Sequence, residues 1–338
     1  MTTPLATVGI LSIGEMGTGI AKLLIAHNFR VVTNLEGRSN DTKTRALSAS
    51  IEIVKDDKTL VSASDYILSI VPPRDALDTA SRISSAFNSQ SQAKSTPLCY
   101  FDLNAISPRS AREIGELFAK KSPAIQFLDG GIIGGTPRLK DDKSPSTTVS
   151  SHPTTTTDWA KPSIPISGPL SQTPPSSFAT FSTTLGLNHI SDDIGIASGL
   201  KCSFASLTKG FTALVLQSFT TANNLGVLPL LISELEQRAP GLRKAANSVT
   251  GMPPKAYRWV REMEEIGITH AEEGGFVGAP SSSGNSGVFN EIAQVYRSVA
   301  DDTVLGDEKT ERRKRGLTIE DVATAMGEGL RAKRRKEE

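Results

Sequence analysis

The sequence predicts an α/β fold: an N-terminal doubly wound domain with a parallel sheet, followed by an all-α C-terminal domain, the two joined by a long interdomain helix. Three observations predict it. Short apolar runs alternate with helical segments in the first part of the chain, Ser, Thr and Pro dominate residues 140–158, and the pattern is helical beyond residue 195. Strand–helix alternation at this spacing is typical of a parallel sheet covered by helices.

Each strand of the N-terminal domain is predicted from a short apolar run that polar, Gly or Pro residues end. The first run opens at Thr7, and Pro72 and Pro73 stop the fourth. The later strands are expected at 30–34, 51–54, 65–73, 98–102, 125–129 and 164–169, and the helices between them at 19–28, 42–48, 75–87 and 108–120. The C-terminal helices are expected at 196–224, 227–237, 256–265, 288–300 and 318–333.

These elements divide the chain into a nucleotide-binding domain (1–194), a helical domain (195–330) and a basic tail (331–338). Within the first domain, 140–158 cannot bury a core and is predicted to be a flexible insertion. The basic tail is interpreted as a solvated helix end, with nuclear localisation or phosphate binding as the alternative.

Composition excludes several classes of function. A net charge of +1 gives no general attraction to nucleic acid or anionic lipid. Two Cys and four scattered His argue against a disulfide framework and a metal site. No signal peptide or spanning apolar run is recognised, so we expect a cytoplasmic protein with no membrane, nucleic-acid or metal partner.

A glycine turn follows the first strand and opens the first helix. This geometry, typical of a Rossmann domain, directs backbone N–H groups and the positive end of a helix at a pyrophosphate. Ser12 stands where the first Gly of G-x-G-x-x-G is expected, and its small side chain permits the turn. The turn residues predicted to bind the cofactor are Ser12, Ile13, Gly14, Glu15, Met16 and Gly17.

The end of the second strand bears on the choice of dinucleotide. Asn34 replaces the acid that often binds the ribose of NAD, although Glu36 is close enough to reach it. Arg38 and Ser39 offer a guanidinium and a hydroxyl to a 2′-phosphate, so we predict NADP with NAD as the alternative. Arg38 as a mere exposed loop residue is the competing interpretation. Val71 and Pro72 are predicted to flank the ribose next to the nicotinamide.

Together these segments resemble the 6-phosphogluconate / β-hydroxyacid dehydrogenase superfamily. The matching motifs are Gly14-Glu15-Met16-Gly17, the segment from Asp102 to Pro108, Asp129-Gly130-Gly131-Ile132-Ile133-Gly134-Gly135, and the Gly-rich lead to Lys201. The region after Lys201, with 207–214 and 258–266, resembles the subfamily with a phosphogluconate-dehydrogenase-like C-terminal domain.

The resemblance implies that Lys201 is the general acid/base, a role that suits an amine in a cleft because desolvation lowers the pKa of a lysine. A lysine snorkelling from the helix surface is the alternative. Asn104 would contact both cofactor and substrate. The other substrate-binding residues implied by their positions are Ser107, Gly134, Gly135, Thr208 and Lys209.

Two positions depart from the family pattern. Ala205 replaces an Asn four residues after the lysine, and Ile133 replaces a Ser before the glycine pair. The expected function is therefore an NAD(P)-dependent oxidoreductase acting on a small hydroxy acid or its carbonyl, rather than on 6-phosphogluconate. The alternatives are an imine reductase-like enzyme and an inactive cofactor-binding regulatory protein.

The long helix also predicts a homodimer. Its apolar side chains exceed what one modest domain is expected to cover. They are Phe204, Leu207, Phe211, Leu214, Val215, Leu216 and Phe219.

Overall fold

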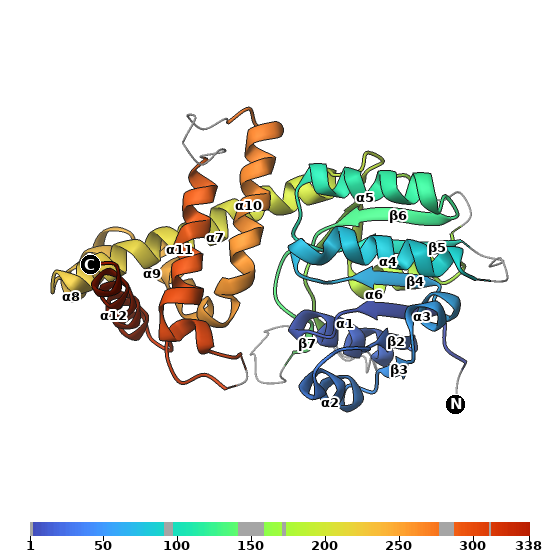
Figure 1. Ribbon diagram of the computed structural model, residues 1–338, viewed down its shortest axis with the longest axis horizontal. Helices are drawn as coiled ribbons and strands as arrows, with labels where there is room; N and C mark the ends of the chain where they lie inside the picture. Colours follow the sequence, from blue (N-terminus) through green and yellow to red (C-terminus); the bar gives the residue numbers. More distant parts are fainter. Residues whose placement is uncertain (1–2, 91–96, 141–158, 171–173, 277–286, 311) are drawn as a thin grey trace, which may run out of the picture. The chain divides into compact units, whose positions relative to one another are not determined.

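The computed structural model describes residues 3–90, 97–140, 159–170, 174–276, 287–310 and 312–338. The chain forms two compact units, Met1–Lys201 and Cys202–Glu338 (Figure 1). Each unit has its own buried hydrophobic residues. The predicted insertion at 140–158 lies, from residue 141 onward, outside the described residues.

The first unit is built on an eight-stranded sheet with the order β10-β9-β6-β5-β4-β1-β2-β3. The six strands from β6 to β3 are parallel, which confirms the predicted doubly wound α/β fold. The strands are β1 (Thr7–Leu11), β2 (Arg30–Asn34), β3 (Glu52–Val54), β4 (Tyr66–Ser69), β5 (Leu98–Asp102), β6 (Ile125–Gly130), β9 (Ile164–Ser167) and β10 (Leu187–Ser191). A separate two-stranded ribbon pairs β7 (Arg138–Leu139) with β8 (Trp159–Ala160).

One edge of the sheet departs from the predicted parallel arrangement. Strand β9 pairs with β6 in the antiparallel direction, and β10 then runs parallel to β9. An edge strand that returns antiparallel is common on otherwise parallel sheets. Its backbone groups complete the hydrogen bonding of β6, whose side chains are almost all buried.

Helices cover both faces of this sheet. One face packs on α1 (Glu15–Ala26), α2 (Asn40–Ser48) and α6 (Phe178–Leu185). The other packs on α3 (Asp57–Ala63), α4 (Ala76–Asn88) and α5 (Pro108–Lys121), and Figure 1 shows α5 lying along β6. Because both faces are buried, the strands are nearly continuous apolar runs, which explains why they could be recognised in the sequence.

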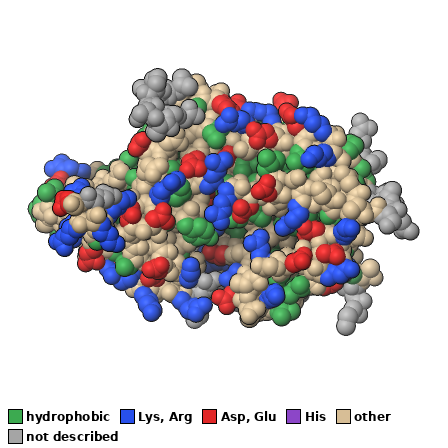
Figure 2. Space-filling view, in the orientation of Figure 1, with side chains coloured by type: hydrophobic (Ala, Val, Ile, Leu, Met, Phe, Trp, Pro, Cys, Tyr) green, Lys and Arg blue, Asp and Glu red, His purple; other side chains and the backbone are tan. Residues whose placement is uncertain are grey.

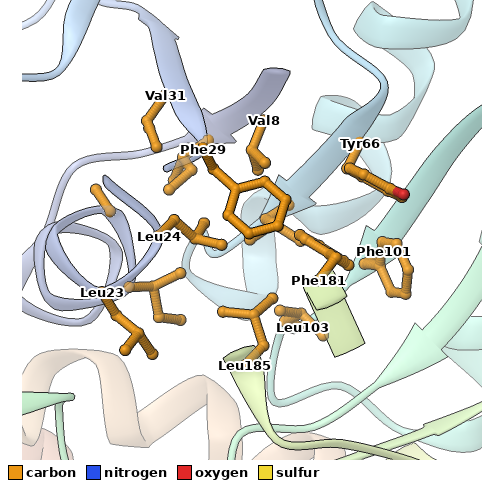
Figure 3. Packing of buried hydrophobic residues seen from close by; sticks show 14 of the residues in the cluster. Val8, Leu23, Leu24, Phe29, Val31, Tyr66, Phe101, Leu103, Phe181 and Leu185 are labelled. Carbon is orange, nitrogen blue, oxygen red and sulfur yellow. The ribbon is translucent and has the colours of Figure 1, made fainter. Parts of the chain in front are cut away.

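Phe181 on α6 is the centre of an aromatic cluster on the first face (Figure 3). Its ring stacks on Tyr66 with 4.0 Å between centroids and meets Phe29 edge-on at 5.9 Å. Leu185, one turn later, points into the same cluster. Helix α6 was not expected from the sequence, because its Thr and Phe residues are only moderate helix formers. Burial of Phe181 and Leu185 decides its conformation.

The second unit is all-helical. The 29-residue α7 (Ile196–Asn224) enters it from the first unit, and the predicted long helix is confirmed residue for residue. The remaining α-helices are α8 (Leu228–Arg238), α9 (Pro240–Ala246), α10 (Ala256–Glu272), α11 (Val288–Asp302) and α12 (Ile319–Glu337). No helix among the described residues is long and apolar enough to cross a bilayer.

We expect Phe181→Ala to lower the free energy of unfolding by about 3–5 kcal/mol, because it empties a fully buried aromatic site. Urea denaturation measures the change. Phe178→Ala is the matched control, since Phe178 lies on the same helix but is only partly buried, and we expect it to cost less than half as much. Equal losses for the two variants would contradict this account of α6.

Candidate functional site

Four polar residues lie side by side at the carboxyl edge of the sheet. Ser69 on β4 is in register with Asp102 on β5, Asp102 with Asp129 on β6, and Asp129 with Ser167 on β9. All four are inaccessible to solvent. The sheet reverses its order between β1 and β4, and open α/β sheets bind ligands at the carboxyl ends of the strands beside such a reversal.

The glycine turn leaves β1 at this edge. Ser12 has φ +80°, the left-handed conformation that glycine adopts without strain and that costs other residues about 1–2 kcal/mol. Ser12, at the first position of the motif, therefore has the backbone conformation expected of a glycine. Arg45 on α2 donates from Nη1 to the carbonyl of Ile13 at 2.9 Å and braces the turn; the sequence analysis did not identify this contact.

The turn fits a pyrophosphate. Gly14 caps α1 without any side-chain hydrogen bond, so the first N–H groups of the helix have no side-chain partner from the cap. A Cβ built on Gly14 meets nothing within 4 Å, whereas one on Gly17 lies 2.4 Å from the carbonyl oxygen of Ser12. Gly14 thus leaves room for a ligand to approach the backbone, and Gly17 permits close packing of helix on strand.

Exposed polar groups follow β2. Arg38 is exposed, and Ser39 caps α2 by accepting from the Thr42 N–H at 3.3 Å. Asn34 is committed inside the protein, because its Nδ2 donates to Asp57 at 2.8 Å and its Oδ1 accepts from the Glu36 N–H at 2.9 Å. Of the ribose-side residues considered in the sequence, Arg38 and Glu36 are therefore the charged groups that the structure leaves exposed.

Asn104 ties the ends of two strands together. Its Oδ1 accepts from the Val71 N–H at 2.7 Å, and its Nδ2 donates to Ser69 Oγ at 3.0 Å and to Asp102 at 2.9 Å. The side chain is 3% exposed. Both ends of the amide are used within the protein, so the geometry gives Asn104 a part in fixing Val71 and the adjoining Pro72 rather than in touching a substrate.

The other loop residues predicted to bind substrate fall into two kinds. Ser107 is buried and caps α5, accepting from the Ser110 N–H at 3.2 Å. Gly134 and Gly135 are exposed on the loop after β6, and Gly134 has φ +127°, which favours glycine. Ile133 before them pairs through both backbone groups with Ser163. The glycine pair, not Ser107, offers an accessible backbone.

Lys201 is held against the same loop. Its Nζ donates to the carbonyl of Ile132 at 2.5 Å, and a Cβ on Gly131 would lie 2.6 Å from the Cβ of Lys201. The side chain is half-buried. The structure therefore brings the ammonium group to the carboxyl edge of β6, where Gly134 and Gly135 also lie.

Two carboxylates lie beside one another under this loop. Burial, with the neighbouring Asp129 adding to it, raises the pKa of Asp102 to about 7. Burial also raises the pKa of Asp129, against the opposing effect of hydrogen bonds from Ser198 and Ser167. Hydrogen bonds favour the ionised form of Asp129 more than that of Asp102, because Asp129 has more donors.

Thr208 and Lys209 lie in the second unit. Thr208 is exposed and its hydroxyl bonds back to the carbonyl of Phe204 at 3.2 Å. Lys209 forms an ion pair with the buried Glu262 and lies 5.0 Å from the centre of the Trp259 ring. The Lys209 charge is therefore compensated by a carboxylate of its own unit, which argues against its predicted pairing with a substrate anion.

The surface carries mixed charge. On the face drawn in Figure 2, Lys and Arg side chains are interspersed with Asp and Glu. Among the described residues no cluster of three or more His, Cys, Asp or Glu is arranged to hold a metal ion.

Comparison with known proteins agrees with this geometry. Residues 7–152 match the NAD binding domain of 6-phosphogluconate dehydrogenase, and residues 222–299 match DUF1932, a domain of unknown function. An uncharacterised 28.5 kDa protein of Methanothermus fervidus is 27% identical over 230 residues, covering 68% of this chain and 76% of that protein.

Solved structures show the same fold. A conserved protein of unknown function, described as structurally similar to 3-hydroxyacid dehydrogenases, is 25% identical with a TM-score of 0.53, covering 87% of this chain and 97% of its own. The 3-hydroxyisobutyrate dehydrogenase of Mycobacterium tuberculosis has a TM-score of 0.59 at 14% identity, covering 94% and 98%.

The chain thus combines a segment that matches the NAD binding domain of 6-phosphogluconate dehydrogenase with a segment that matches DUF1932, and it is similar in fold to 3-hydroxyacid dehydrogenases.

Replacing each of the two turn glycines by Ala, one at a time, distinguishes an effect on cofactor binding from an effect on stability. Gly14→Ala meets open space, so we expect the free energy of unfolding to change by less than about 1 kcal/mol while NADPH affinity falls about ten-fold. Gly17→Ala forces a clash with the Ser12 carbonyl and is expected to destabilise the fold. Thermal unfolding and NADPH fluorescence titration measure both effects; unchanged affinity in Gly14→Ala would argue against a pyrophosphate at this turn.

The Asp102 carboxyl predicts a pH dependence of stability. Its pKa in the folded state, about 7, lies above its ordinary value of 3.8, so the folded state holds the extra proton between these values. Stability from this group is full below pH 3.8 and is lost as pH rises toward 7. The unfolding free energy of wild type minus that of Asp102→Asn should therefore fall by a few kcal/mol over that range, since one pKa unit corresponds to about 1.4 kcal/mol.

Urea denaturation at a series of pH values measures the difference. Asp78→Asn, which removes a carboxylate at an exposed position, is the control. A flat profile for Asp102→Asn would show that Asp102 is ionised throughout.

Proposed function

We propose that this protein is an NADP-dependent oxidoreductase that interconverts a small hydroxy acid and the corresponding carbonyl compound, with Lys201 as general acid/base. The observation that carries the proposal is the placement of the Lys201 ammonium on the Ile132 carbonyl, at the same sheet edge as the glycine turn. The match of residues 7–152 to the NAD binding domain of 6-phosphogluconate dehydrogenase supports the reaction class.

The cofactor is proposed to lie along this edge. The backbone of Gly14 and the N-terminus of α1 would hold the pyrophosphate, and Arg38 with Ser39 would face the 2′-phosphate of NADP. Arg offers planar, bidentate contacts to phosphate, and the internal hydrogen bonds of Asn34 leave that group less suited to a ribose hydroxyl. A lower dissociation constant for NADPH than for NADH tests this preference.

The chain's own residues supply the proton chemistry. A bound nicotinamide dinucleotide would supply hydride transfer to or from the substrate carbon that bears the hydroxyl or carbonyl oxygen. Lys201 would accept the hydroxyl proton in oxidation and return it to the oxygen in reduction. The backbone N–H groups of Gly134 and Gly135 are proposed to bind the substrate carboxylate. Asn104 and Ser107 shape the adjoining loops through their internal hydrogen bonds.

We also propose a homodimer. On the part of α7 within the second unit, Leu207 is 76% exposed, Leu214 56% and Phe204 45%, which is unusual for large apolar side chains on one helix. Val215, Leu216 and Phe219 do not contribute, because their own unit buries them. Part of the apolar surface of the helix is therefore covered by its own unit, and the proposal rests on Phe204, Leu207 and Leu214.

Lys201→Ala is expected to bind NADPH as wild type does and to lose at least about 100-fold in kcat, the range that general acid–base catalysis contributes. Turnover is measured over a panel of small hydroxy acids with NADP, and NADPH affinity by fluorescence. Lys22→Ala, an exposed lysine on α1, is the control. Full activity in Lys201→Ala refutes the assignment, and NADPH binding without turnover over the whole panel favours a regulatory protein instead.

A further inference from the structure

The start of α7 is held by a carboxylate from the sheet. Asp129, fully buried on β6, accepts hydrogen bonds at Oδ2 from the N–H groups of Gly195 at 3.1 Å and Ser198 at 3.0 Å, and from Ser167 Oγ at 2.9 Å. Its Oδ1 accepts from Ser198 Oγ at 2.5 Å. One acid thus satisfies two backbone and two hydroxyl donors.

The two backbone donors, the N–H groups of Gly195 and Ser198, are ones that a helix start leaves without intrahelical partners. The first N–H groups of an α-helix have no intrahelical acceptor and are usually satisfied by the side chain of the residue before the helix. That residue is Gly195, with φ +100° and no side chain. Asp129, which lies on β6, accepts the hydrogen bonds of these N–H groups instead. Ser167 Oγ, on β9, accepts the Ala197 N–H at 3.0 Å.

The segment from Asp129 to Ile132 contacts both Ser198 and Lys201. Ser198 and Lys201 are three residues apart and lie on one face of the helix. Asp129 and Ile132, likewise three residues apart, each hold one of them: Asp129 bonds Ser198, and the Ile132 carbonyl bonds the Lys201 ammonium. Gly131 between them leaves the space that the Lys201 side chain fills.

We propose that Asp129 is a positioning residue for Lys201: by binding the first turn of α7 it sets the rotation and height of the helix, and so the place of the lysine ammonium over the loop after β6. The proposal rests on the proposed function for its catalytic consequence. Asp129 itself touches the backbone of Gly195 and the side chain of Ser198, not the reacting atoms.

The charge and shape of the carboxylate explain why an acid occupies this place. All four of these partners donate, and an ionised aspartate has only acceptor atoms. Asparagine of the same size would turn an NH₂ group toward one or more of these donors. A negative charge also suits the positive end of a 29-residue helix.

Asp129→Asn tests the proposal, with Asp193→Asn as the matched control because Asp193 is exposed two residues before Gly195. We expect NADPH affinity within two-fold of wild type, kcat reduced about thirty-fold or more and KM changed much less. Independently of turnover, acetylation of Lys201 by an amine-reactive ester, followed by mass spectrometry, should become several-fold faster as the ammonium leaves the Ile132 carbonyl. The control should match wild type in all four measurements.

Ser198→Ala covers the case in which Asp129→Asn does not fold. It removes the shortest of the four bonds and leaves the carboxylate with three donors, so smaller changes in the same direction are expected. Wild-type acetylation of Lys201 in a folded Asp129→Asn, or in Ser198→Ala if the first variant is unfolded, overturns the proposal.

The two proposals fail separately. If wild type turns over no hydroxy acid but Asp129→Asn still accelerates Lys201 acetylation, the positioning stands and the proposed function falls. If Lys201→Ala abolishes turnover while Asp129→Asn changes neither kcat nor acetylation, the function stands and the positioning falls.

Discussion

The burial of two aspartates side by side, at the ends of β5 and β6, is the constraint around which the candidate site is arranged. A buried carboxyl must be neutral or well supplied with hydrogen-bond donors. Asp102 accepts a hydrogen bond from Asn104, and Asn104 in turn holds the Val71 N–H after β4. Asp129 accepts hydrogen bonds from the start of α7, the helix that carries Lys201. The need to satisfy two buried groups thus orders the loops on both sides of the sheet edge.

This arrangement explains why the glycine turn alone is a weak guide. Ser12 adopts the left-handed conformation that a glycine would, at some cost in backbone strain. The strain is balanced by neighbours: the Arg45 guanidinium holds the Ile13 carbonyl, and Gly17 allows the helix to approach the Ser12 carbonyl closely. An imperfect motif in sequence becomes a complete turn in structure.

Much of the fold follows from the sequence because the central strands are apolar on both faces and polar residues, prolines or glycines end them. Helix α3 was missed because it is only seven residues long, and α6 because its helical form depends on the burial of Phe181. The antiparallel pairing of β9 could not be predicted, since strand direction depends on the path of the chain between residues 130 and 164 and not on local composition.

The candidate site was predictable to a lesser degree. The sequence pointed to the turn at Gly14 and to Lys201, because both have recognisable neighbours. It could not assign the role of Asp129, whose donors Ser167 and Ser198 come from distant parts of the chain. It also assigned to Lys209 a substrate contact without foreseeing Glu262, its partner 53 positions along the chain (262 − 209).

The central claim is that the carboxyl edge of this sheet binds a nicotinamide dinucleotide. Amide hydrogen exchange of the full chain, with and without saturating NADPH, tests it most directly. The account predicts slower exchange at residues 12–18, which form the turn and the start of α1, and at residues 70–71 after β4. Protection confined to the second unit, or none at saturation, would contradict it.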